Sequence, residues 1–277
     1  MRKRWVFVVA PLIALALAVG LYFALRPAGP GGEEGGQVGG PTGLPTVVAA
    51  VGNTCVACHR QIPEGTLTGH SFRDWERSLH AAQDVACEAC HGGDPTKGAK
   101  DRAHEGVIPS TELGSTVYFK NIPATCGRCH TGEFERFQTS VHYRQLEEEG
   151  RGPNCVTCHG AMAISILTPE ELQQTCSACH NERLGIKPVE PIKARYVLIM
   201  FSQVKAYLEA VKELVELKKA AGQEVAAAEA LIAQAEQELQ EVRREWHTFI
   251  VDRIEEGVQK AFATVQAAVK QLQNVEE

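Results

Sequence analysis

Ten cysteines stand in five copies of one short motif, and their spacing allows a specific covalent chemistry. Each copy reads Cys-x-x-Cys-His, and no cysteine lies outside the five copies. The cysteines are Cys55, Cys58, Cys87, Cys90, Cys126, Cys129, Cys155, Cys158, Cys176 and Cys179. Two thiols at this spacing on a helical turn can form thioethers with the two vinyl groups of one porphyrin. The sequence therefore predicts five covalently attached haem c groups.

The histidine that ends each motif supplies the second half of this chemistry, because its imidazole can reach the iron as the proximal ligand. The five proximal candidates are His59, His91, His130, His159 and His180. A zinc site, a redox-active Cys-x-x-Cys pair and a disulfide framework are the alternatives. Zinc does not require a histidine after every second cysteine, and a redox pair would not be repeated five times.

Five further histidines match the number of predicted irons, so we expect them to be the distal ligands. They are His70, His80, His104, His142 and His247. Met162 competes with them, because a methionine thioether also binds haem iron and this residue follows His159 closely. Packing against the core or a haem edge is the favoured interpretation of Met162, and Met200 is a weaker candidate still.

Two of the distal candidates belong to a small internal repeat. In the segments from Trp75 to His80 and from Phe137 to His142, an aromatic residue is followed three positions later by serine and five positions later by histidine. Each segment leads on to a Cys-x-x-Cys-His motif. His247 stands far from every motif, but Trp246 and Phe249 beside it indicate a buried face. If His247 binds iron, the C-terminal helices must dock on the haem domain.

The ligand set separates two classes of function. Two imidazoles saturate the iron and leave no position for a substrate, which favours electron transfer. The alternative is a multihaem oxidoreductase in which one five-coordinate haem acts on a small nitrogen or sulfur compound. A structural haem store or filament subunit has no positive motif. The net charge of −6 does not indicate a nucleic-acid partner.

The N-terminus carries a membrane signal. Three basic residues precede an uncharged stretch from Trp5 to Leu25, long enough to cross a bilayer. We expect residues 1–26 to be an anchor, or else a cleaved signal peptide, with the rest of the chain outside the cytoplasm. Residues 27–46 are rich in glycine and proline and are expected to form a flexible linker.

The remaining chain divides by composition. Residues 47–190 hold all five motifs and are expected to form a mainly α, haem-packed domain with little or no sheet. Residues 191–277 lack cysteine and are rich in good helix formers, which predicts two long helices, roughly 192–220 and 223–273, with a break at Gly222. These helices could fold back as a hairpin or form a coiled coil that mediates dimer or hetero-complex formation.

The motifs, the two repeated segments and the helical C-terminus with His247 resemble the multihaem cytochrome c superfamily over roughly residues 53–260. This superfamily includes the cytochrome c-554/hydroxylamine oxidoreductase branch and pentahaem nitrite reductase. The resemblance implies closely stacked haems and dimerising C-terminal helices. All five motifs here end in histidine, whereas the nitrite reductases typically have lysine at the catalytic haem.

The anchor is shared with membrane quinol dehydrogenases of the same broad group. We therefore expect quinol or a quinol-oxidising membrane protein as one partner, and a soluble or extracellular redox protein as the other. A methionine close after the first motif is common in those dehydrogenases. Here Arg60, Gln61 and Ile62 follow that motif instead.

Overall fold

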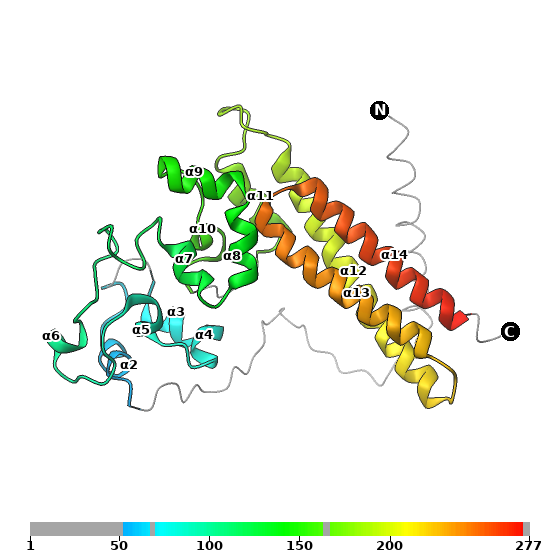
Figure 1. Ribbon diagram of the computed structural model, residues 1–277, viewed down its shortest axis with the longest axis horizontal. Coiled ribbons are helices and arrows are strands. Elements are labelled where there is room, and N and C mark those ends of the chain that lie inside the picture. Colours follow the sequence, from blue (N-terminus) through cyan, green and yellow to red (C-terminus); the bar gives the residue numbers. More distant parts are fainter. Residues whose placement is uncertain (1–51, 67–69, 163–166, 274–277) are drawn as a thin grey trace, which may run out of the picture. The chain divides into compact units, whose positions relative to one another are not determined.

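The computed structural model describes residues 52–66, 70–162 and 167–273, all within one compact unit, Pro45–Glu277. Every regular element in these ranges is a helix, which confirms the predicted mainly α fold (Figure 1). Among the described residues, no helix has the length and apolar character that a membrane span requires. The predicted anchor, Trp5 to Leu25, and the linker lie outside the described ranges. The division into domains at residues 190 and 191 stays a prediction.

The cysteine-containing part consists of short helices joined by loops. Their bounds are α2 Thr54–His59, α3 Phe72–Glu76, α4 Leu79–Ala82, α5 Cys87–His91, α6 Lys100–Ala103, α7 Ile122–Gly127, α8 Thr131–Gln138, α9 Val141–Glu149, α10 Cys155–His159 and α11 Pro169–Ser177. Polar caps begin many of them: Ser71, Asn154 and Thr168 each accept a hydrogen bond from the first turn of the helix that follows.

This part has a small side-chain core. Among the described residues of this part, the buried apolar cluster consists of Val56, Trp75, Ala81 and Ala86, with Phe72, Cys87 and Met162 packed against it, and Phe137 and Leu146 are buried outside it. A domain of this size normally buries a larger contiguous set of apolar side chains. The sparse core agrees with the expectation that flat prosthetic groups fill the interior.

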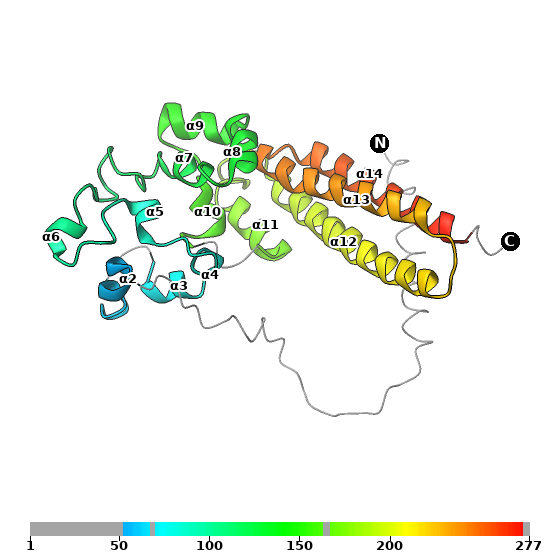
Figure 2. The same cartoon turned by 60° about the horizontal axis from the view of Figure 1, so that its bottom comes forward.

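The C-terminal part has a large core of its own, formed by α12 Glu190–Ala220, α13 Ala226–Glu245 and α14 Val251–Gln273 (Figure 2). Buried residues recur every three or four positions along each helix, as on the inner face of a helix bundle. The cluster comprises Val197, Val204, Leu208, Val211, Val215, Val225, Ala228, Ile232, Ala235, Leu239, Val242, Ile254, Val258, Ala261, Val265, Ala268 and Leu272. The region therefore folds as a three-helix bundle.

The prediction of one continuous helix over residues 223–273 is wrong, because two helices, α13 and α14, occupy this range. The break at Gly222 is present, with φ +77° after the end of α12. A second reversal follows α13, where a 3₁₀ turn, η1 Trp246–Thr248, leads to Phe249 in the left-handed conformation at φ 58°. The Thr248 hydroxyl donates to the Glu245 carbonyl at 2.9 Å and accepts from the Ile250 amide at 3.2 Å. This turn lets α14 pack back along α13.

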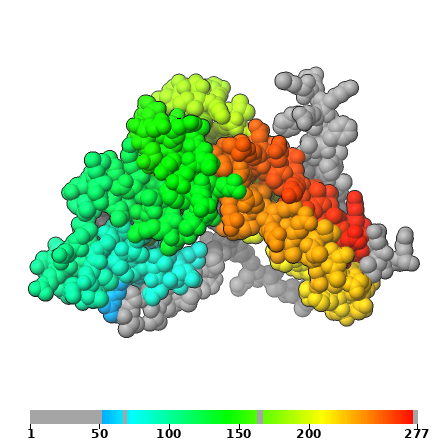
Figure 3. Space-filling model, in the orientation of Figure 1, coloured from blue at the N-terminus to red at the C-terminus, as the bar shows by residue number. Residues whose placement is uncertain are grey.

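The turn at Trp246–Ile250 also contacts the cysteine-containing part. Helix α8 packs against η1 and the end of α13, and Figure 3 shows the green surface of α8 against the orange surface of this turn. Helix α11 packs on α12. The bundle is therefore docked on the cysteine-containing part at the residues that surround His247.

Candidate functional site

The five motifs lie on helical turns, as covalent haem attachment requires. The first, second and fourth motifs are contained in α2, α5 and α10. The third and fifth begin in the last turns of α7 and α11, where the amides of His130 and His180 donate to Cys126 and Cys176 carbonyls at 2.9 Å. None of the ten cysteines, all described, forms a disulfide. In the described ranges, no three or more His, Cys, Asp or Glu side chains gather in a group that could hold a metal ion by themselves.

Each motif histidine faces one of the five further histidines. We number the sites by motif order and give the distance between ring centroids. Site 1 is His59 with His104 at 6.1 Å, site 2 is His91 with His70 at 6.0 Å, site 3 is His130 with His80 at 6.2 Å, site 4 is His159 with His247 at 6.2 Å, and site 5 is His180 with His142 at 5.8 Å. All ten histidines of the chain are used once.

These separations fit a haem iron between the two rings. An imidazole nitrogen bonds a metal at about 2 Å and the ring centre lies roughly 1 Å further out, so two axial imidazoles have centroids about 6 Å apart. Direct stacking or hydrogen bonding of the rings would bring their centroids closer together. The residues present therefore fit the group that the motifs imply.

The lowered pKa values of several histidines also suit the binding of iron. Burial is the main cause that lowers the pKa of His59, His80, His91, His142, His159 and His247. For His142 the pKa falls to about 4. A lowered pKa keeps the imidazole neutral, which is the form that binds metals.

The repeated segments have the same local structure. Ser78 and Ser140 are buried N-cap residues whose hydroxyls accept from the amides of Ala81 and Tyr143. The histidine two positions after each serine therefore lies in the first helical turn, in α4 and in α9. The aromatic residues that open the segments, Trp75 and Phe137, are buried and fix the preceding turn.

In both repeated segments, the histidine does not face the histidine of the next motif along the chain. His80 precedes the second motif but faces His130 of the third, and His142 precedes the fourth but faces His180 of the fifth. The repeated segment thus supplies its histidine to the motif after next. Sequence order alone leaves this pairing open, because the intervening chain is long enough to reach several motifs.

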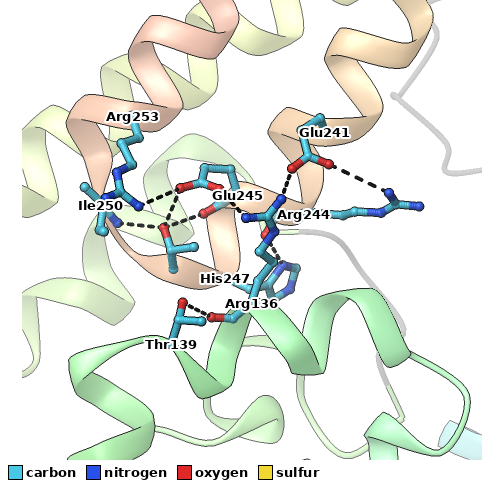
Figure 4. A network of polar contacts seen from close by, with 9 residues as sticks. Arg136, Thr139, Glu241, Arg244, Glu245, His247, Ile250 and Arg253 are labelled. Atoms are coloured by element: carbon cyan, nitrogen blue, oxygen red, sulfur yellow. Dashed lines mark hydrogen bonds and ion pairs between the residues drawn. The ribbon is translucent and has the colours of Figure 1, made fainter.

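His247 reaches site 4 from the turn of the bundle. Its Nδ1 lies 3.3 Å from the Arg244 carbonyl. Burial lowers the pKa of His247, and the Arg244 backbone and Glu133 of α8 partly oppose this. Arg136, also on α8, forms ion pairs with Glu241 and, at 3.4 Å, with Glu245 (Figure 4). These contacts join the end of α13 to α8 beside the third motif.

Consecutive motifs are neighbours in space. The side chain of Cys155 lies beside that of Cys126 and lowers the pKa of the Cys126 thiol. The pKa of Cys87 is raised to about 11, mainly by burial and secondly by the neighbouring Cys55. The pKa of Cys176 is raised to about 11 as well, mainly by burial and secondly by the neighbouring Cys158.

The second and third motifs are joined as well. Burial and then the neighbouring Cys126 raise the pKa of Cys90. The Arg128 guanidinium donates to the Ala89 carbonyl at 2.7 Å. Sites 1 to 5 therefore follow one another in space in the order of their motifs.

The two methionine candidates lie elsewhere. Met162 packs against the small cluster around Trp75 and lines a pocket that also includes His70, His91 and Cys87. His80 of site 3 lines the same pocket, so Met162 borders sites 2 and 3, whereas its closest motif in sequence belongs to site 4. Met200 packs against the core of the bundle. The packing interpretation of Met162 fits its position.

Some residues around the sites were not anticipated. The sequence indicated Phe249 only as a neighbour of His247, yet the centroid of its ring lies 4.5 Å from the ring centroid of His142. Arg136 was not singled out. Neither has a sequence signal, because their importance depends on the turn that brings residues 246–250 against α8 and α9.

Comparison with known proteins shows a partial similarity. No family model matches the chain, and no solved structure does. The chain is 25% identical over 136 residues to the multiheme cytochrome MtrA of Shewanella baltica (strain OS185), covering 49% of this chain and 33% of that protein. The chain therefore spans about a third of that relative's length. Together with the five attachment motifs, this similarity supports a multihaem c-type cytochrome.

Proposed function

We propose that the chain is an electron-transfer protein with five haem c groups, each held between two histidines. The observation that carries the proposal is the pairing of all ten histidines at 5.8–6.2 Å, with one motif histidine in every pair. Two imidazoles complete the coordination of the iron, so its remaining chemistry is gain and loss of one electron. The protein supplies attachment, spacing and burial.

The order of the sites supports a linear route. Neighbouring cysteines connect site 1 to site 2, and so on to site 5. A haem attached at each motif would have its closest partners at the preceding and following motifs. Electrons entering at one end of the series would leave at the other.

The partners and location form the finer part of the proposal. The uncharged stretch from Trp5 to Leu25 after three basic residues supports an N-terminal membrane anchor. Export is needed because c-type haem is attached outside the cytoplasmic membrane. We propose an extracytoplasmic haem domain that takes electrons from quinol or a quinol-oxidising membrane protein and passes them to a periplasmic or extracellular redox protein. Dimerisation through the C-terminal helices stays a prediction.

The oxidoreductase alternative requires an iron with an open position. In the part of the chain that the structure describes, every motif histidine has a histidine opposite it, and Met162 borders sites 2 and 3, which each already have two. The geometry therefore favours the carrier over the enzyme.

The test is spin state and ligand binding in the purified, haem-loaded protein. We expect electron paramagnetic resonance to show low-spin ferric haem only, and the reduced protein to form no carbon monoxide adduct. The mass should exceed that of the mature polypeptide by five haem groups. A high-spin signal from one haem in five, with a carbon monoxide adduct of the same amount, would overturn the carrier assignment.

The angles between paired rings predict the form of the low-spin spectrum. The planes differ by 39°, 42° and 31° at sites 1, 2 and 4, but by 79° and 68° at sites 3 and 5. Nearly perpendicular imidazoles leave two iron d orbitals close in energy, which makes the g tensor strongly anisotropic. We expect two haems with such signals and three with rhombic signals. Five signals of one class would contradict this geometry.

A further inference from the structure

Three buried side-chain nitrogens in the part of the chain that the structure describes have no hydrogen-bond partner: Nδ1 of His142, Nε of Arg195 and Nε1 of Trp246. All three lie where the bundle meets sites 4 and 5. Trp246 opens the turn that contains His247 of site 4, and His142 belongs to site 5. Arg195 of α12 contacts α11, the helix that leads into the fifth motif. Buried polar groups normally have partners, so this region needs acceptors that the described side chains do not supply.

Of the three, Trp246 has the clearest need of a partner. Arg195 donates through its two terminal nitrogens to side chains of α11, at 2.6 and 3.2 Å. The ring of His142 packs edge-on against that of Phe249, with centroids 4.5 Å apart. The indole of Trp246 has one polar atom, and this nitrogen can only donate. The partner that Trp246 requires is therefore a hydrogen-bond acceptor.

The surroundings of Trp246 limit what this acceptor can be. The indole packs against the apolar core of the bundle. A buried water usually makes about three hydrogen bonds, and an apolar wall offers it few partners. The neighbouring carboxylate of Glu245 is already engaged by Arg136, Arg253 and the hydroxyl of Thr248. A carboxylate held in place by another attachment fits better than either.

Site 4 can supply such a carboxylate. Each haem c carries two propionate carboxylates, which accept hydrogen bonds when ionised. Trp246 directly precedes His247 in η1, and the iron of site 4 would lie between His247 and His159, whose ring centroids are 6.2 Å apart. The indole is therefore anchored beside the haem of this site. A hydrogen bond from an N–H to a carboxylate is stronger than one to a neutral acceptor, which suits a donor removed from water.

We propose that the indole N–H of Trp246 donates a hydrogen bond to a propionate carboxylate of the haem at site 4. This assignment takes His159 and His247 as axial ligands and so rests on the proposed function. The turn Trp246–Thr248 would then bind this haem at two points, the iron through His247 and the propionate through Trp246. Docking of the bundle and binding of the fourth haem would depend on the same turn.

The test removes the donor and keeps an aromatic ring. In Trp246→Phe, the propionate carboxylates of the full haem-loaded chain are followed by redox-difference infrared spectroscopy, with carbon-13 in these carboxylates to identify their bands. We expect one labelled carboxylate band to shift from the frequency of a hydrogen-bonded group to that of a free one. Trp75→Phe is the matched control, because Nε1 of Trp75 donates to the Val85 carbonyl at 2.9 Å. Its labelled bands should coincide with those of the wild-type protein.

The structure of the haem-loaded wild-type protein gives a check that does not depend on a variant. Nε1 of Trp246 should lie about 2.7–3.2 Å from a propionate oxygen of the haem attached at Cys155 and Cys158. A water or a different acceptor at Nε1, or labelled bands of Trp246→Phe that coincide with those of the wild type, would overturn the assignment while five low-spin haems still supported the proposed function. A high-spin haem in the wild-type protein would instead count against the axial ligands themselves.

Discussion

Replacing His247 with alanine is expected to convert one haem in five from low spin to high spin. His247 is the histidine opposite His159, at 6.2 Å between ring centroids, and Met162 borders sites 2 and 3. Loss of its imidazole would leave site 4 with one axial ligand. We expect about one carbon monoxide bound per reduced chain in the variant, where the unaltered protein binds none. The readouts are electron paramagnetic resonance and carbon monoxide titration.

Two controls separate ligand loss from loss of docking. Arg136→Gln removes the ion pairs with Glu241 and Glu245 beside His247 and keeps the imidazole. Arg136 is 42% exposed, and ion pairs at the surface contribute about 0–1 kcal/mol, so this variant should stay low spin. Added imidazole should restore the low-spin signal of His247→Ala, because the free ligand can occupy the opened position. An entirely low-spin His247→Ala protein without added imidazole would show that His247 is not the ligand.

The sequence contained the candidate ligands but not their assignment. Counting five motifs and five further histidines was enough to propose both axial sets. The pairing depends on loops: His80 passes its nearest following motif and faces His130. Packing among segments that lie far apart in the sequence determines which histidine faces which motif, so no local sequence pattern predicts the pairing.

The turn between α13 and α14 could not be predicted from the sequence for a related reason. The stretch from Trp246 to Ile250 contains neither glycine nor proline, the residues that usually mark a break. Phe249 adopts the left-handed conformation although its side chain disfavours it. The packing of α14 along α13 and the contacts of this turn with α8 offset that local cost. The hydrophobic periodicity predicted the helical region, but the position of this turn depends on tertiary contacts.

The distal histidine of site 1 depends on a glycine. His104 follows α6, and the carbonyl of Ala103 in this helix accepts from the Asp94 amide at 3.0 Å. Gly93 lies against the same carbonyl: a Cβ at this position would be 2.6 Å from the Ala103 oxygen and 2.9 Å from Cγ2 of Val107. Its φ of +91° is also one that residues with a side chain rarely adopt.

Gly93→Ala is therefore expected to displace α6 and to weaken the contact between His104 and site 1. Backbone strain and overpacking together should cost about 2–6 kcal/mol of folding free energy. The displaced histidine should give a fractional high-spin signal that exogenous imidazole removes, together with a lower midpoint of thermal unfolding. Because the obstructing atom is a backbone oxygen, no side-chain rotation can relieve the overlap.

Gly98→Ala is the matched control, because a Cβ at Gly98 meets nothing within 4 Å and the position has no positive φ. It should leave all five sites low spin and change stability by no more than about 1 kcal/mol. The two alanines lie in the same loop between the second motif and α6, so the comparison isolates the contact with Ala103. If Gly93→Ala unfolds at the same temperature as Gly98→Ala and stays fully low spin, the close packing of this loop does not position His104. A lower unfolding temperature with intact low-spin signals would mean that the loop can shift without moving the ligand, and that His104 is held chiefly by its own bond to the iron.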